Sequence, residues 1–242
     1  MQEIIDQSLF TCQGVAGLWR AHSVGDDVEL FSDCSMENRL GVFRFLRRQQ
    51  VLPNQPQFCL SDFVAPAESS RIDYLGAFAV SAGPEVDEIA ERYKADQDDY
   101  SSILVKSLGD RFAEAMAEFL HKQVRDLWGF GKHEELSNEE LIAEKYRGIR
   151  PAAGYPCQPD HTEKDLIWKL LEVEDTIGLK LTESRAMYPG CSVSGLYFSH
   201  PDARYFNVGS LGKDQVRDYA ERKEWSWEEA VKWLRPNLGF DD

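Results

Sequence analysis

Apolar positions follow two different periods along this chain, and the change between them separates predicted strands from predicted helices. Residues 3 to 10 resemble the last turns of a helix. Apolar runs on both sides of VGDD, at positions 24 to 27, predict a β-hairpin, because a short turn containing glycine joins such runs. A third strand is predicted in FCLSDFV, residues 58 to 64, and a fourth in residues 74 to 83, whose nearly apolar sequence indicates burial in a sheet.

Helical spacing of the apolar residues begins after Pro84. A first helix is followed by a longer one, predicted from about Tyr100 to Leu127, whose apolar stripe is expected to face the core. The apolar positions are Val86, Ile89, Ala90 and Tyr93 in the first helix, and Ile103, Leu104, Leu108, Phe112, Ala115, Met116, Phe119 and Leu120 in the second.

Capping signals mark shorter helices in the second half of the chain. Ser137 with Glu140 predicts a capping box at the start of NEELIAEKY. Asp160 is expected to cap a helix that begins at His161 or Thr162.

The chain then continues with a predicted hairpin and two short helices. Strands are expected at 192 to 198 and 204 to 209 around a turn at 200 to 203, and Ser226 with Glu229 caps the last helix. Strand runs at both ends with helices between them predict an α+β fold with a mostly antiparallel sheet. The length of 242 residues, without a linker rich in Gly, Ser or Pro, favours a single domain over residues 1 to 242.

The net charge of −15 narrows the possible partners. Nucleic acid and anionic membranes require clustered Lys and Arg, so neither is expected as a partner. Without a long apolar run or an apolar signal block near the start, we expect a cytoplasmic protein. Five scattered cysteines, Cys34 among them, predict reduced thiols, and no metal site is expected because H-x-x-H, H-E-x-x-H and C-x-x-C are absent.

The stretch RPAAGYPCQPDHTEK, residues 150 to 164, stands apart from this pattern. Its prolines at 151, 156 and 159 remove backbone donors and fix φ, which excludes helix and central strand as far as the last of them. The stretch is therefore predicted to be a rigid loop, a common place for binding groups.

The side chains of this loop suit a small zwitterionic, partly aromatic ligand. Arg150 offers a planar, permanently charged clamp for a carboxylate or phosphate. Residues 152 to 154 are Ala, Ala and Gly, so a ligand can approach their backbone. Tyr155 adds a flat face, and His161 lies at the start of a helix, where the dipole favours the neutral imidazole.

A purely structural explanation fits the same residues. In it, Arg150 pairs with a nearby carboxylate such as Glu144, Tyr155 fills the core, His161 caps or packs, and Cys157 is a passive thiol. No Ser, His and Asp arrangement, catalytic carboxylate pair or glycine-rich nucleotide loop is apparent. The residues therefore support a binding site before they support an enzyme.

At this loop the chain resembles a known family. GIRPAAGYPCQPDHTEK, KLTESRAMYPGCSVSGLYFSHPDARYFNVG and DQVRDYAERK are similar to the C-terminal activation domain of cobalamin-dependent methionine synthase. The similarity continues upstream through VGDDVELF, CLSDFVAP, DYLGAFAVSAG, DDYSSILVKSLGDRFAEAMAEFLH and LSNEELI, so it covers nearly the whole chain.

The resemblance implies a curved α+β domain, with a bent antiparallel sheet, that binds S-adenosylmethionine in a shallow groove. In that family the cobalamin cofactor occasionally oxidises to the inactive cob(II)alamin state. The activation domain then caps the cobalamin domain, while flavodoxin or a diflavin reductase supplies an electron and S-adenosylmethionine supplies the methyl group. The protein contributes binding, orientation and electrostatics to this chemistry.

The resemblance also implies site residues. The family's R-x-x-x-G-Y pattern falls on Arg150, Gly154 and Tyr155, with Arg150 on the methionine carboxylate. From the residues alone, Glu114 fits a solvated helix face and Tyr205 an ordinary strand aromatic, so only the resemblance makes them ligand contacts. The resemblance also assigns Ala152 through its backbone and Phe206 as ligand contacts, and Tyr155 and His161 as groups that face cobalamin.

The family's domain begins some tens of residues earlier and carries there an aspartate that contacts the ligand's amino group. We therefore expect a domain that lacks its N-terminal part and binds more weakly. Alone, the chain is not expected to make methionine, because cobalamin is held by a partner module. Two alternatives stay open: a non-catalytic capping or interaction module, and a stand-alone reactivase of another corrinoid protein.

Overall fold

The computed structural model describes residues 2–33 and 35–241, so Cys34 lies outside the described residues. The first unit comprises Met1–Gly17, Phe78–Tyr146 and Ile167–Ser194, and the second comprises Leu18–Ala77, Arg147–Leu166 and Gly195–Asp242. The strands are β1 (Gln13–Val24), β2 (Asp27–Phe31), β3 (Arg39–Arg44), β4 (Asp73–Ser81), β5 (Lys180–Leu181), β6 (Met187–Tyr188) and β7 (Ser192–Tyr197).

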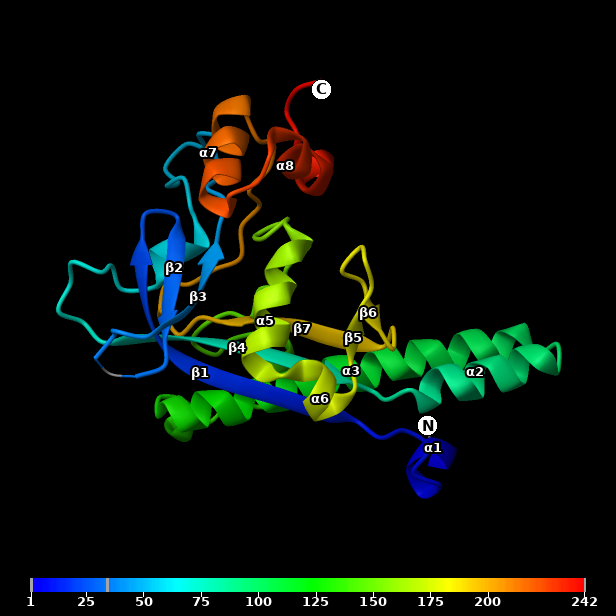
Figure 1. Ribbon diagram of the computed structural model, residues 1–242. Helices are drawn as coiled ribbons and strands as arrows, with labels where there is room; N and C mark the ends of the chain where they lie inside the picture. The colour runs from blue at the N-terminus through cyan, green and yellow to red at the C-terminus, as the bar shows by residue number, and fades with distance from the viewer. Residues whose placement is uncertain (1, 34, 242) are drawn as a thin grey trace. The chain divides into compact units, whose positions relative to one another are not determined.

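Helices occupy the segments between the strands and the C-terminal region (Figure 1). The α-helices are α1 (Gln2–Asp6), α2 (Glu85–Ala95), α3 (Asp99–Trp128), α4 (Asn138–Ile142), α5 (Lys164–Leu171), α6 (Val173–Ile177), α7 (Lys213–Lys223) and α8 (Trp227–Leu234). The 3-10 helices are η1 (Leu60–Phe63), η2 (Gly131–His133), η3 (His161–Glu163) and η4 (Arg235–Asn237).

A five-stranded sheet has the order β3-β2-β1-β4-β7, and β1, β4 and β7 each contribute residues to both units. β2 is antiparallel to both β1 and β3. The predicted hairpin is confirmed: Val24 pairs with Asp27 across a turn in which Gly25 has a φ of +59°, a left-handed conformation that favours glycine. The α+β class with an antiparallel sheet is also confirmed.

In the first unit, α2 and α3 pack side by side (Figure 1). Their contact is close at Gly109, where an added Cβ would lie 2.7 Å from a Val86 methyl and 2.9 Å from the Cys191 sulfur. The Asp98 side chain accepts a hydrogen bond from the Ser101 N–H at 3.0 Å at the start of α3. The core around them consists of Ala82, Val86, Ile89, Ala90, Val105, Ala113 and Cys191.

The predicted apolar stripe of α3 is wrong in part. Ile103, Leu104 and Phe119 are 68%, 44% and 57% exposed. As far as Ala117 the buried face instead carries mainly small residues, because neighbouring elements approach the helix most closely there, and beyond it the face carries the larger His121 and Arg125. These buried positions are Ser102, Val105, Gly109, Ala113, Ala117, His121, Val124 and Arg125.

In the second unit, α7 and α8 pack together and α7 contacts β3. The predicted cap of α8 is confirmed, since the Ser226 hydroxyl accepts from the Glu229 N–H at 3.2 Å. The Ser137 capping box at α4 is confirmed as well. Fully or nearly fully buried side chains of this unit include Val28, Leu30, Phe43, Phe45, Phe198 and Tyr219.

Two predicted strands are wrong. Residues 60–63 form η1, because the Asp62 carboxylate accepts from the Cys59 N–H at 2.8 Å and closes a helical turn; the third strand is β3 instead. Residues 204–209, all described, form no strand, since the Val208 N–H donates to the Pro156 carbonyl at 2.9 Å rather than to a neighbouring strand. The short β5–β6 hairpin was not predicted.

Candidate ligand-binding site

In the second unit, the loop at residues 150–164 is fixed to the end of β7 and to the residue that follows it. Ile149 and Phe198 exchange two backbone hydrogen bonds of 3.0 Å, and both side chains are buried. The Leu196 N–H donates to the Pro151 carbonyl at 2.9 Å. Arg150 therefore lies between two anchored neighbours, which limits the positions that its side chain can reach.

Arg150 and Tyr205, distant in sequence, meet at the head of this loop. The Arg150 N–H donates to the Tyr205 hydroxyl at 3.1 Å. Arg150 is half-buried and Tyr205 is 46% exposed, so both remain accessible to a ligand. The structure thus brings together two of the residues that the resemblance assigns to the site.

Gly154 sets the geometry of the next turn. Its N–H donates to the Gln158 carbonyl at 2.7 Å, and the Gln158 N–H donates to the Tyr155 carbonyl at 2.8 Å. The φ of Gly154 is +92°, and an added Cβ would collide with the His161 imidazole. Only glycine therefore fits here, and the turn places His161 directly against the residue before Tyr155.

The accessible groups of this turn are those expected of a binding surface. Tyr155 is 66% exposed, so the alternative in which it fills the core is wrong. Ala152 is half-buried beside the buried Ala153. The exposed ring of Tyr155 and the backbone at Ala152 and Gly154 are therefore open to contact from outside the loop.

Cys157 and Phe206 form the buried underside of the loop. The Cys157 thiol donates to the Phe206 carbonyl at 2.8 Å, and the Phe206 N–H donates back to the sulfur at 3.1 Å. Burial raises the pKa of the Cys157 thiol, which keeps it protonated and supports its expected passive role. The Phe206 ring is 8% exposed and packs near Phe58, so the structure places it beneath the surface.

His161 begins η3 as predicted, with Asp160 as its cap. The Asp160 carboxylate accepts from the Thr162 N–H at 2.8 Å. His161 Nδ1 lies 3.0 Å from the Lys164 ammonium. Partial burial, and next the positive charge of Lys164, lower the pKa of His161, so the neutral imidazole is favoured near neutral pH.

Glu114 belongs to the first unit, whereas the other candidate residues belong to the second. It is exposed on α3, where its carboxylate accepts from Arg111 at 2.6 Å. Its part in the ligand site stays a prediction.

Sequence reasoning missed a buried ionic cluster under the end of the loop. Asp160 and Glu163 are 0% and 4% exposed, and both approach the ammonium of Lys223 on α7. Burial raises the pKa of Glu163 to about 7, although Lys223 opposes the shift. The sequence carries no local signal for this cluster, because its cation lies sixty positions further along the chain.

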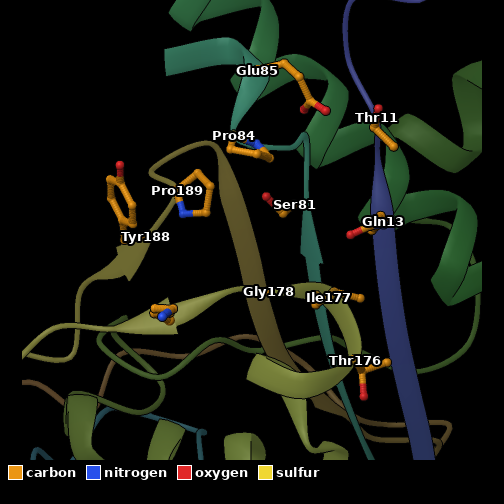
Figure 2. Close-up of a pocket in the computed structure, with 11 residues that line it drawn as sticks. Thr11, Gln13, Ser81, Pro84, Glu85, Thr176, Ile177, Gly178, Tyr188 and Pro189 are labelled. Atoms are coloured by element: carbon orange, nitrogen blue, oxygen red, sulfur yellow. The ribbon is translucent and has the colours of Figure 1, made fainter. Parts of the chain in front are cut away.

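The first unit has a separate cavity of about 450 Å³, in which Tyr188 and Pro189 lie on one side and Thr11 and Gln13 on the other (Figure 2). None of the candidate residues lines it. Within residues 2–33 and 35–241, no cluster of three or more His, Cys, Asp or Glu side chains could hold a metal ion. No helix in this described part is long and apolar enough to span a membrane.

Comparisons with known proteins agree with this geometry. The family described as "Vitamin B12 dependent methionine synthase, activation domain" matches residues 1–224. A solved structure, "Crystal Structure of the MetH Reactivation Domain bound to AdoHcy", is 51% identical, with a TM-score of 0.97 over 99% of this chain and 74% of that chain. This chain therefore belongs to the family of vitamin B12-dependent methionine synthase activation domains.

Proposed function

We propose that this chain binds S-adenosylmethionine and acts as the reactivation domain of a cobalamin-dependent methionine synthase, a methyltransferase. The observation that carries the proposal is the similarity, at 51% identity over nearly the whole chain, to a reactivation domain bound to S-adenosylhomocysteine. S-adenosylhomocysteine is what remains when S-adenosylmethionine has given up its methyl group. A site that holds the product is suited to the donor as well.

The loop at 150–164 supplies the groups that this ligand requires. Arg150, held between two anchored neighbours, binds the methionine carboxylate with its planar guanidinium. The half-buried backbone at Ala152 and Gly154 offers carbonyl groups to the polar edge of the adenine, while the Gly154 N–H stays bonded to Gln158. Tyr205, joined to the Arg150 backbone at 3.1 Å, contacts the ligand beside it.

The remaining candidates of the second unit complete the proposed site. Phe206 supports the ligand from beneath, and the part of Glu114, which belongs to the first unit, stays a prediction. Tyr155 and His161 face the cobalamin, for which the exposed ring of Tyr155 and the neutral imidazole of His161 are suited because neither brings a charge to the corrin.

The proposed reaction is the reductive methylation of cob(II)alamin to methylcobalamin. One electron from a flavodoxin or a diflavin reductase and the methyl group of S-adenosylmethionine are consumed, and S-adenosylhomocysteine is released. Bound cobalamin, held by a partner module, supplies the nucleophile for the methyl group. The chain's own residues bind the donor, orient its methyl group and cover the reacting centre, in a cytoplasmic setting where the electron donors are available.

Isothermal titration of the chain with S-adenosylmethionine tests the proposal. We expect the wild type to bind and Arg150→Ala to bind about tenfold or more weakly, because a charged hydrogen bond is lost. Arg147→Ala is the matched control: this exposed arginine lies three positions earlier and bonds the Ser199 carbonyl at 2.6 Å. Wild type that fails to bind, or equal affinity in Arg150→Ala, would contradict the proposal.

A further inference from the structure

The end of the ligand-binding loop rests on a buried cluster with two carboxylates and one ammonium. The Lys223 ammonium lies 3.1 Å from Asp160 Oδ2 and 2.5 Å from Glu163 Oε1. It also donates to the Thr162 hydroxyl at 2.8 Å. The Tyr219 hydroxyl donates to Asp160 Oδ2 at 2.7 Å. Helix α7 therefore binds the loop through two side chains one helical turn apart.

The same cluster is tied to the sheet through a single residue of β3. Glu163 Oε2 accepts from the Arg44 N–H at 2.9 Å, and the Gln158 side-chain amide donates to the Arg44 carbonyl at 2.9 Å. Both ends of residues 158–163 are thus fixed to the backbone of one residue, Arg44. His161, between the two buried carboxylates, is held where its ring contacts Gly154.

The buried charges of this cluster destabilise the folded chain unless each charge keeps its partner. Removing one partner of a buried ion pair leaves an uncompensated charge in a medium that solvates it poorly. Lys223 is the cation that both buried carboxylates share, and its side chain is only 10% exposed. Loss of Lys223 therefore frees two carboxylates at once, and water can reach them only if the loop moves.

We propose that Lys223 and Tyr219 of α7 are positioning residues for S-adenosylmethionine: by holding Asp160 and Glu163 they fix the loop that presents Arg150 and Tyr155. This inference rests on the proposed function. Both residues act through the loop rather than on the ligand, because Tyr219 is fully buried and the Lys223 ammonium is engaged by Asp160, Thr162 and Glu163.

The test compares two cations that are neighbours on α7. Lys223→Met removes the link to the loop. Arg222→Met removes ion pairs with Asp27 on β2 and Asp218 on α7, a bond to the Phe45 carbonyl and a contact over the Tyr219 ring, but no contact with the loop itself. We expect Lys223→Met to weaken S-adenosylmethionine binding about tenfold or more, and Arg222→Met to change it less than about twofold. An equal loss in both variants would overturn the inference, because it would reflect general destabilisation.

Amide hydrogen exchange of the unliganded chain provides a readout that does not depend on ligand. The Gly154 and Gln158 amides, both hydrogen-bonded within the turn, should exchange at least about tenfold faster in Lys223→Met and at the wild-type rate in Arg222→Met. Unchanged exchange in Lys223→Met would overturn the inference. If wild type binds no S-adenosylmethionine but the exchange result holds, the proposed function fails while the positioning of the loop stands.

A second-site rescue separates charge from packing. In Lys223→Met with Glu163→Gln, a neutral amide replaces one of the two carboxylates that have lost their cation. The amide oxygen can still accept the hydrogen bond from the Arg44 N–H. We expect this double variant to recover most of the lost amide protection, and no recovery would contradict the inference. If Lys223→Met does not fold, Tyr219→Phe is the second variant, because it removes the 2.7 Å bond to Asp160 and the longer 3.4 Å bond to the Arg44 carbonyl. It should weaken S-adenosylmethionine binding and speed exchange of the Gly154 and Gln158 amides about threefold.

Discussion

The ligand-binding loop and helix α3 show opposite relations between sequence and structure. In the loop, prolines and Gly154 restrict the backbone by their own covalent geometry, so its irregular, rigid character follows from the residues themselves. On α3, the bulkiest apolar residues are partly exposed, and the buried face is set by how closely other elements approach Gly109. Local restrictions can thus be predicted from sequence, whereas burial on a helix depends on its partners.

The largest expected effect is at Gly154. We predict that Gly154→Ala lowers the free energy of unfolding by about 3 to 4 kcal/mol, because a left-handed φ and a collision with His161 act together. Urea denaturation followed by circular dichroism measures the change.

Gly129, the C-cap of α3, is the matched control for this substitution. Its φ is +97°, but an added Cβ meets nothing within 4 Å. Gly129→Ala should therefore cost only about 1 kcal/mol, the strain of the backbone alone. Equal costs at the two glycines would show that the contact with His161 does not constrain the loop.

The second prediction concerns the pH dependence of stability. Because burial raises the pKa of Glu163 from 4.5 to about 7 in the folded chain, protonated Glu163 stabilises the fold at low pH. This contribution is complete below the unfolded pKa and is lost as the pH rises through about 7, by up to about 3 kcal/mol. Urea denaturation at several pH values between about 5 and 8 measures the fall.

Glu163→Gln is the control for this pH effect, since glutamine does not titrate. Its unfolding free energy should decline less than that of wild type over the same pH range. Parallel pH curves for the two proteins would place the titrating group elsewhere.

The third prediction addresses the two faces of α3. Val105→Ala should lower the free energy of unfolding by about 2 kcal/mol, because the Val105 side chain is only 9% exposed. Ile103 lies two residues earlier and is 68% exposed, so Ile103→Ala should lower the free energy of unfolding by less than about 0.5 kcal/mol, although it removes a larger apolar side chain. If thermal denaturation showed a larger destabilisation in Ile103→Ala than in Val105→Ala, the apolar stripe predicted from the sequence would be the buried face of α3.

The parts of the fold that the sequence predicted correctly depend on signals within a few residues. The Ser137 and Ser226 caps, the Asp160 cap and the hairpin turn at Gly25 each form from neighbouring residues. The strand expected at 58–64 fails because one side chain, Asp62, closes a 3-10 turn that the apolar residues around it do not indicate.

The candidate site also has features that follow from neighbouring residues and features that depend on residues far apart in sequence. The exposed Tyr155 and the Gly154 turn follow from the composition of the loop. No local pattern predicts the bond between Arg150 and Tyr205 or the ion pairs of Lys223, because each joins residues far apart in sequence. Only the family resemblance pointed to Tyr205 in advance.

Transfer of a labelled methyl group tests the central claim most directly. The chain is mixed with a cobalamin-binding module in the cob(II)alamin state, a reduced flavodoxin and S-adenosylmethionine labelled in its methyl group. We predict that label enters the cobalamin only when the chain is present, and that Arg150→Ala reduces the rate about tenfold or more while Arg147→Ala does not. Equal labelling without the chain, or with Arg150→Ala in its place, would contradict the account.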